Sequence, residues 1–116
     1  MAVNQEIQKI TELIRQTVPA ERIYLFGSHA YGTPHKDSDY DFYVIIPEGS
    51  MRPIEAMQKA YRALYPIAAS IPNVDVVAST QRNFDLMRRR TNTIEGDIAE
   101  KGVLLYERHS LGTQVA

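Results

Sequence analysis

Two aspartates, Asp39 and Asp41, stand two residues apart where an apolar segment, residues 42 to 46, begins. Alternate residues of a strand face the same side, so this spacing brings the two carboxylates together. When both are ionised they repel, and the pKa of at least one rises unless a cation lies between them. Carboxylate oxygens suit Mg²⁺, so the pair indicates a metal site. A turn-shaping role explains Asp39 adequately but Asp41 poorly, because Asp41 lies inside the strand pattern.

Gly27 and Ser28 precede this pair, with ten residues between Ser28 and Asp39. Glycine permits a positive φ and a close approach of the backbone to a ligand, so a Gly-Ser turn can cradle phosphate. The alternative is an ordinary turn after a strand, with Ser28 as a helix cap. Taken alone, the two residues favour that plain turn; beside two carboxylates, they favour a nucleotide-binding role.

Asp75 interrupts a run of valines at 74, 76 and 77. An acid inside a β-branched strand is costly unless it is paired, bound to a metal or exposed to solvent on an edge strand. The edge-strand explanation is sufficient for Asp75 by itself. Together with Asp39 and Asp41, we interpret Asp75 as the third carboxylate of one site.

Hydrophobic periodicity and turn residues predict the elements that hold these side chains. Helices are expected at 4–18, from Pro53 until Pro66 kinks or ends it, at 81–90 and at 93–101, with one helical turn after Ser28. Strands are expected at 22–26, 39–46, 74–78 and 103–106.

The motifs also constrain the sheet. The Gly-Ser turn leaves the end of the first strand, whereas the aspartates stand at the start of the second, so the two strands must be antiparallel for the residues to share an edge. Asp75 lies at the start of the third strand, which must therefore run parallel to the second. Residues 47 to 73 are long enough for the crossover that a parallel pair needs. We predict an α/β fold with a small mixed sheet flanked by helices.

The composition fits one domain, residues 1–116. Apolar residues make up 44% and charged residues 23%, the net charge is −1, and there is no cysteine. Disulfides and thiolate metal sites are excluded. No global positive field would attract nucleic acid, so we do not expect direct binding to it. No secretory signal or membrane-spanning run is visible, and a cytoplasmic location is the default expectation.

The segments Gly-Ser-His-Ala-Tyr-Gly at 27–32 and Ser-Asp-Tyr-Asp at 38–41, before an aliphatic run, resemble the nucleotidyltransferase superfamily that includes DNA polymerase β. The likeness is to its minimal nucleotidyltransferase (MNT) branch, the antitoxins of HEPN/MNT toxin–antitoxin systems. It is close over residues 22 to 46 and extends loosely through Asp75 to residues 103–107. Many members carry arginine where this chain has Tyr31.

The resemblance implies a polymerase β-like fold and an ATP- or other NTP-dependent transferase. Asp39 and Asp41 would hold two Mg²⁺ ions, and Gly27 and Ser28 would grip the triphosphate. Asp75 would help to hold one metal ion and take the proton of an attacking hydroxyl. Transfer of AMP from ATP to a hydroxyl of a HEPN-type partner protein is the implied activity, with an oligomeric complex as an open possibility.

Two other functions stay open. The chain could be a non-catalytic antitoxin that neutralises a HEPN-type partner by contact, or a nucleotidyltransferase acting on a small molecule such as an aminoglycoside. Phe84, Leu86 and Met87 are candidates for partner contact, with core packing as the alternative. The arginines at 88–90 are either a solvated helix end or a contact for RNA, nucleotide or an acidic partner.

Overall fold

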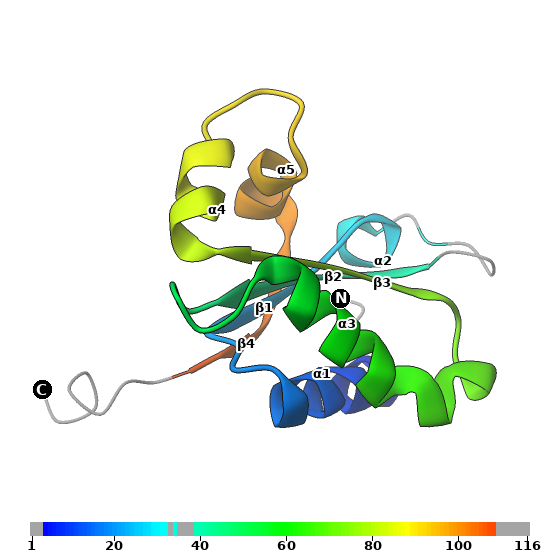
Figure 1. The fold of residues 1–116 in the computed structure, drawn as a ribbon. Helices are drawn as coiled ribbons and strands as arrows, with labels where there is room; N and C mark the ends of the chain where they lie inside the picture. Colours follow the sequence, from blue (N-terminus) through cyan, green and yellow to red (C-terminus); the bar gives the residue numbers. More distant parts are fainter. Residues whose placement is uncertain (1–3, 33, 35–38, 109–116) are drawn as a thin grey trace, which may run out of the picture.

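The fold is a four-stranded mixed sheet with helices on both faces (Figure 1). The computed structural model describes residues 4–32, 34 and 39–108. The strands are β1 (Arg22–Phe26), β2 (Tyr40–Ile46), β3 (Val74–Thr80) and β4 (Val103–Glu107). The helices are α1 (Gln5–Thr17), α2 (Ser28–Tyr31), α3 (Pro53–Leu64), a 3₁₀ helix (Tyr65–Ser70), α4 (Gln81–Met87) and α5 (Ile94–Lys101).

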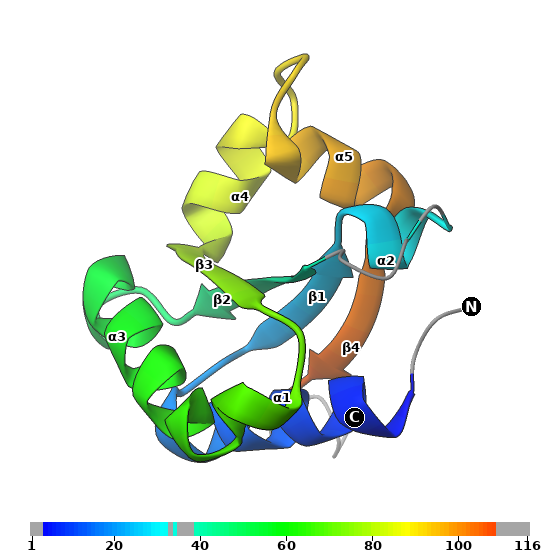
Figure 2. The same cartoon turned by 90° about the vertical axis from the view of Figure 1, so that its right-hand side faces the viewer.

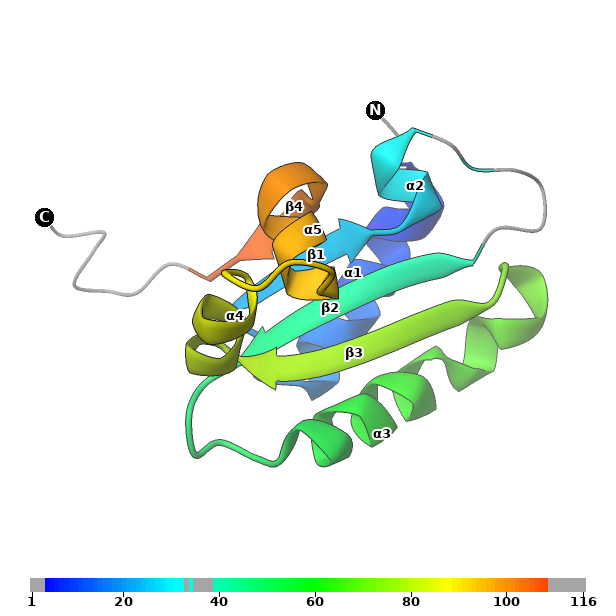
Figure 3. The same ribbon diagram turned by 90° about the horizontal axis from the view of Figure 1, so that it is seen from above.

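The order of the strands is β3-β2-β1-β4. β1 pairs with β2 and with β4 in antiparallel orientation, whereas β2 and β3 are parallel. Both orientations that the motifs required are therefore confirmed. The end of β1 and the starts of β2 and β3 meet at one edge of the sheet, which Figure 3 shows beside α2.

Helices α1 and α3 cover one face of the sheet, and α4 and α5 cover the other (Figure 2). Alternate residues of β2 divide between the two layers. Phe42 and Val44 belong to the larger core under α1 and α3, whereas Tyr43 and Ile45 contact Phe84 of α4 and Ile98 of α5 in a smaller core. Asp41 is two residues before Tyr43 and so belongs to the face of the smaller core.

The start of α1 follows the capping rules. The side chain of Asn4 accepts a hydrogen bond from the amide of Ile7 at 2.8 Å, so Asn4 is the N-cap of the helix. Ile7, Ile10 and Ile14 are fully buried along one helical stripe. Helix α1 therefore forms from a good cap and one continuous apolar face.

The buried face of α3 differs from the expectation. Helical spacing predicted a stripe of Ile54, Met57, Tyr61 and Leu64. Leu64 is buried and Met57 packs against the core, but the exposed fractions of Ile54 and Tyr61 are 48% and 45%. Besides Leu64, the buried residues of α3 are Ala56 and Ala60. These residues also form a helical stripe, and alanine side chains let a helix backbone lie close to its neighbours.

Helix α4 is shorter than the expected span of 81–90, because it ends at Met87 and residues 88–93 form a turn. Thr80 is its N-cap, and its side chain accepts a hydrogen bond from the amide of Asn83. Phe84 is only 2% exposed, so its proposed role in partner contact is wrong and the core alternative holds.

Over the described ranges 4–32 and 39–108, no helix has the length and apolar character to cross a bilayer.

Candidate functional site

Asp41 and Asp75 lie side by side on the parallel strands β2 and β3. They are direct partners in the register of the two strands, at the edge where both strands begin. In-register neighbours of a parallel pair point to the same face of the sheet, here the face of α4 and α5. The structure thus brings together two of the three acids that the sequence selected, and does so through the backbone pairing itself.

The carboxyl group of Asp41 has an unusual electrostatic environment. Its pKa is raised from 3.8 to about 6, first by burial and then by the negative charges of Asp75 and Asp39. The charge of His29 acts in the opposite direction, and a side-chain hydrogen bond with Asp75 raises the pKa further. A carboxylate held in this way is stabilised by a cation, because a cation would offset both the repulsion and the lost hydration.

Gly27 makes room for Asp41. It follows Phe26, the residue of β1 that pairs with Asp41, and its φ is 75° and its ψ is −163°. A Cβ atom at this position would overlap Oδ2 of Asp41 and lie 3.0 Å from its Cγ. Only glycine meets both the dihedral angles and the lack of space, so the glycine of the Gly-Ser turn is tied directly to the acid.

Asp39 lies just before β2 and is half-buried. Its charge raises the pKa of Asp41, so it contributes to the same electrostatic site. However, within the described part of the chain no three carboxylate or imidazole side chains are gathered closely enough to hold a metal ion. The chemistry of the donors fits a divalent cation, but a metal centre made by Asp39, Asp41 and Asp75 together stays a prediction.

Ser28 is the first residue of α2, so the expected helical turn after it is present. The ring of His29 lies 4.4 Å from that of Tyr40, measured between centroids. The Tyr31 hydroxyl is buried and makes no hydrogen bond to the described residues, and burial raises its pKa. His35 and Lys36, for which no role was assigned, lie outside the described residues.

Sequence reasoning missed one polar link beside the site. The hydroxyl of Tyr43, two residues beyond Asp41, donates a hydrogen bond of 2.8 Å to Glu95 of α5. Glu95 is only 8% exposed. The burial of Glu95 could have been predicted from its position three residues before Ile98, which places both residues on the buried side of α5.

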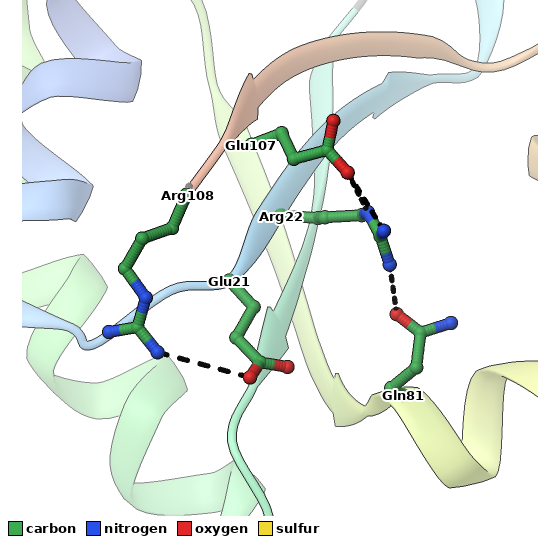
Figure 4. Close-up of a pocket in the computed structure, with 5 residues that line it drawn as sticks. All are labelled: Glu21, Arg22, Gln81, Glu107 and Arg108. Carbon is green, nitrogen blue, oxygen red and sulfur yellow. Dashed lines mark hydrogen bonds and ion pairs between the residues drawn. The ribbon is translucent and has the colours of Figure 1, made fainter. Parts of the chain in front are cut away.

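A separate polar hollow lies at the other end of β1 and has a structural role (Figure 4). Arg22, the first residue of β1, forms an ion pair with Glu107 and donates a hydrogen bond to Gln81. Arg108 pairs with Glu21 at 3.9 Å. These side chains satisfy one another and join β4 to β1 and α4, so the hollow is distinct from the site at Asp41.

The four-stranded mixed sheet with helices on both faces has the fold of a nucleotidyltransferase. The family model described as "Polymerase beta, Nucleotidyltransferase" matches residues 8–111. The chain therefore belongs to the polymerase beta nucleotidyltransferase family.

The chain is also similar to individual proteins. The protein adenylyltransferase MntA of Shewanella oneidensis is 44% identical over 41 residues, a segment that spans 34% of this chain and 30% of that protein. A crystal structure of a toxin–antitoxin with AMP-PNP superimposes with a TM-score of 0.61 at 23% identity, covering 97% of this chain and 80% of the other.

A further solved structure is the tri-AMPylated Shewanella oneidensis HEPN toxin in complex with MNT antitoxin. Its match has a TM-score of 0.53 at 22% identity and covers 90% of this chain and 74% of the other. At these identities, the structural matches support the fold, and the activity is inferred from the site.

Proposed function

We propose that the chain is a divalent-cation-dependent nucleotidyltransferase that transfers AMP from ATP to a hydroxyl of a HEPN-type partner protein. The observation that carries this proposal is the in-register pair Asp41 and Asp75 beside Gly27. The adenylyltransferase relative and the AMPylated HEPN complex supply the nucleotide, the acceptor class and the antitoxin role.

The chain's own residues have separate tasks in this proposal. The metal site would be formed by Asp39, Asp41 and Asp75, and we propose that it holds two Mg²⁺ ions. The phosphates of ATP would be held by Gly27 and Ser28. Bound Mg²⁺ neutralises charge that develops on the phosphates during transfer. Asp75 also accepts the proton of the acceptor hydroxyl.

The transfer step conserves atoms and charge. The acceptor oxygen forms a bond to the α-phosphorus of ATP while the bond from that phosphorus to the oxygen bridging to the β-phosphate breaks. Pyrophosphate leaves with the bonding electron pair, and AMP remains attached to the partner. Asp75 lies on the edge strand β3 and is exposed to solvent, so an acceptor hydroxyl can approach its carboxylate and give up the proton to it.

Labelled ATP tests the proposal. With Mg²⁺ and a HEPN-type partner protein, label from the α-phosphate should appear on the partner, whereas label from the γ-phosphate should not. Asp41→Asn should lower the rate of transfer by about 100-fold or more. Glu48→Gln, which neutralises an exposed acid in the turn after β2, should transfer at the wild-type rate.

Labelling of the partner by γ-labelled ATP would mean phosphoryl transfer and would overturn the proposed chemistry. A partner that binds tightly without gaining either label would support the non-catalytic antitoxin. One observation favours that second candidate, since the described acids do not form a group ready to hold a metal ion. No observation favours a small-molecule acceptor.

A further inference from the structure

The turn between α4 and α5 presents three positive charges flanked by exposed aliphatic side chains. We define the arginine-turn surface as Leu86, Arg88, Arg89, Arg90 and Ile94. All five residues are exposed, Leu86 by 59% and Ile94 by 39%. None of the ion pairs formed within residues 4–32 and 39–108 involves these arginines. Arg88 lies over the ring of Phe84, 5.9 Å from its centroid, and no ion pair with a described residue neutralises the three charges.

The turn that carries the arginines is held in one conformation. The hydroxyl of Thr93 lies 3.0 Å from the carbonyl of Met87 and 3.1 Å from that of Arg90, and it accepts a hydrogen bond of 2.9 Å from the amide of Gly96. A Cβ on Gly96 would approach the Arg90 carbonyl to 3.3 Å, so the turn lies close against α5. A backbone fixed in this way loses little entropy when a partner binds.

This surface stands above the face of the sheet that holds the acids. Phe84 of α4 and Ile98 of α5 contact Tyr43, which lies on the same face of β2 as Asp41. Figure 1 shows the turn projecting from that face, on the side opposite to α1 and α3. A macromolecule held on the turn would therefore lie on the same face of the sheet as Asp41 and Asp75.

The chemistry of the surface favours a protein over a nucleic acid. The whole chain has a net charge of −1, so it lacks the extended positive field that non-specific nucleic-acid binding needs. Arginine is enriched at protein interfaces, whose buried centres are apolar, and Leu86 and Ile94 supply such apolar contacts beside the charges. Localised charge of this kind directs the orientation of a protein partner.

We propose that the arginine-turn surface docks an acidic patch of the acceptor protein and orients its hydroxyl toward Asp41 and Asp75. This inference rests on the proposed function, which requires a protein acceptor. It adds the surface that binds the acceptor and the charge that the acceptor must carry there.

Charge reversal tests the inference with a matched control. The variant Arg88→Glu, Arg89→Glu, Arg90→Glu changes the net charge by the same amount as Lys9→Glu, Lys59→Glu, Arg62→Glu. The control residues are exposed on α1 and α3, which cover the opposite face. Both variants should unfold near the wild-type temperature, because all six side chains are exposed.

Binding to a HEPN-type partner protein is measured by titration calorimetry at low and high salt. The arginine variant should weaken the affinity by about 30-fold or more at low salt and lose most of the salt dependence. The control should change the affinity by less than about threefold. The variant Arg88→Lys, Arg89→Lys, Arg90→Lys should keep most of the binding, because it keeps the three positive charges.

Equal affinity of the arginine variant and the control would overturn the inference, even if AMP transfer were intact. Binding of a single-stranded RNA oligonucleotide to the arginines, with unchanged affinity for the protein partner, would also overturn it in favour of nucleic acid. Partner binding through the arginines without any AMP transfer would contradict the proposed function and leave the docking surface standing.

Discussion

Asp41 and Asp75 are nearest neighbours across the parallel pair β2 and β3, and their carboxyl groups share one face of the sheet. The pairing of the backbones fixes this closeness, so the side chains cannot separate widely without breaking the ladder. Their mutual repulsion contributes to the raised pKa of Asp41. The site thus stores electrostatic repulsion that a bound cation would relieve.

The first prediction concerns the stability of the cation-free protein as the pH changes. Because folding raises the pKa of Asp41 from 3.8 to about 6, the folded state binds the proton more tightly than the unfolded state does. The resulting stabilisation is complete below about pH 4 and is lost as the pH rises through 6. The variant Asp41→Asn has no charge to gain at this position, so its stability does not fall when the pH rises. It should be more stable than wild type by about 1–2 kcal/mol at pH 8.

Urea unfolding between pH 4 and pH 8, with a chelator present, measures this difference. The gain should shrink toward zero near pH 4, where the wild-type carboxyl is protonated. Glu48→Gln is the control and should follow the wild-type curve. A constant offset between Asp41→Asn and wild type over the whole range would contradict the raised pKa.

The second prediction separates backbone strain from damage to the site. Gly27→Ala and Gly49→Ala both place a side chain at a positive φ, 75° and 76° respectively. Each should cost roughly 1–3 kcal/mol in the free energy of unfolding. Only the Cβ at Gly27 displaces Asp41, since no atom lies within 4 Å of the Cβ position at Gly49.

Gly27→Ala should therefore lose AMP transfer at temperatures where it is still folded, whereas Gly49→Ala should keep the wild-type rate. Thermal unfolding and the rate of label transfer are measured on the same samples. Full activity of folded Gly27→Ala would show that the contact between this glycine and Asp41 has no part in the function.

The third prediction addresses the link between the sheet and α5. Tyr43→Phe removes the hydroxyl that donates to the buried carboxyl group of Glu95 and should cost about 1–3 kcal/mol. Tyr65→Phe is the control, because Tyr65 is 80% exposed. Adding Glu95→Gln to Tyr43→Phe should recover part of the loss in denaturant unfolding. Unchanged stability of Tyr43→Phe would mean that the hydrogen bond contributes nothing net.

The paired acids could be predicted because their constraint is local and topological. The spacing of Asp39 and Asp41, and the need for one shared edge, required β1 and β2 to be antiparallel and β2 and β3 to be parallel. The structure confirms both pairings. Proline, glycine and capping residues also placed most element boundaries within a few residues, because they act through their own backbone geometry.

The remaining features depend on tertiary packing. The alanine face of α3 is buried although Ile54 and Tyr61 are more hydrophobic, because the fit against neighbouring elements decided which face turns inward. Glu95 is buried because Tyr43 supplies a hydrogen bond from a distant strand. Neither relationship is encoded in a short stretch of sequence, and a periodicity count cannot reveal it.

Cation binding at the paired acids is the most direct test of the central claim. Titration of Mn²⁺ into the protein in the presence of ATP, followed by electron paramagnetic resonance, should show bound ions in wild type and in Glu48→Gln. Asp41→Asn and Asp75→Asn should weaken this binding by about 10-fold or more. If Asp41→Asn binds Mn²⁺ and ATP as tightly as wild type does, then the pair on β2 and β3 is not the metal centre of a nucleotidyltransferase.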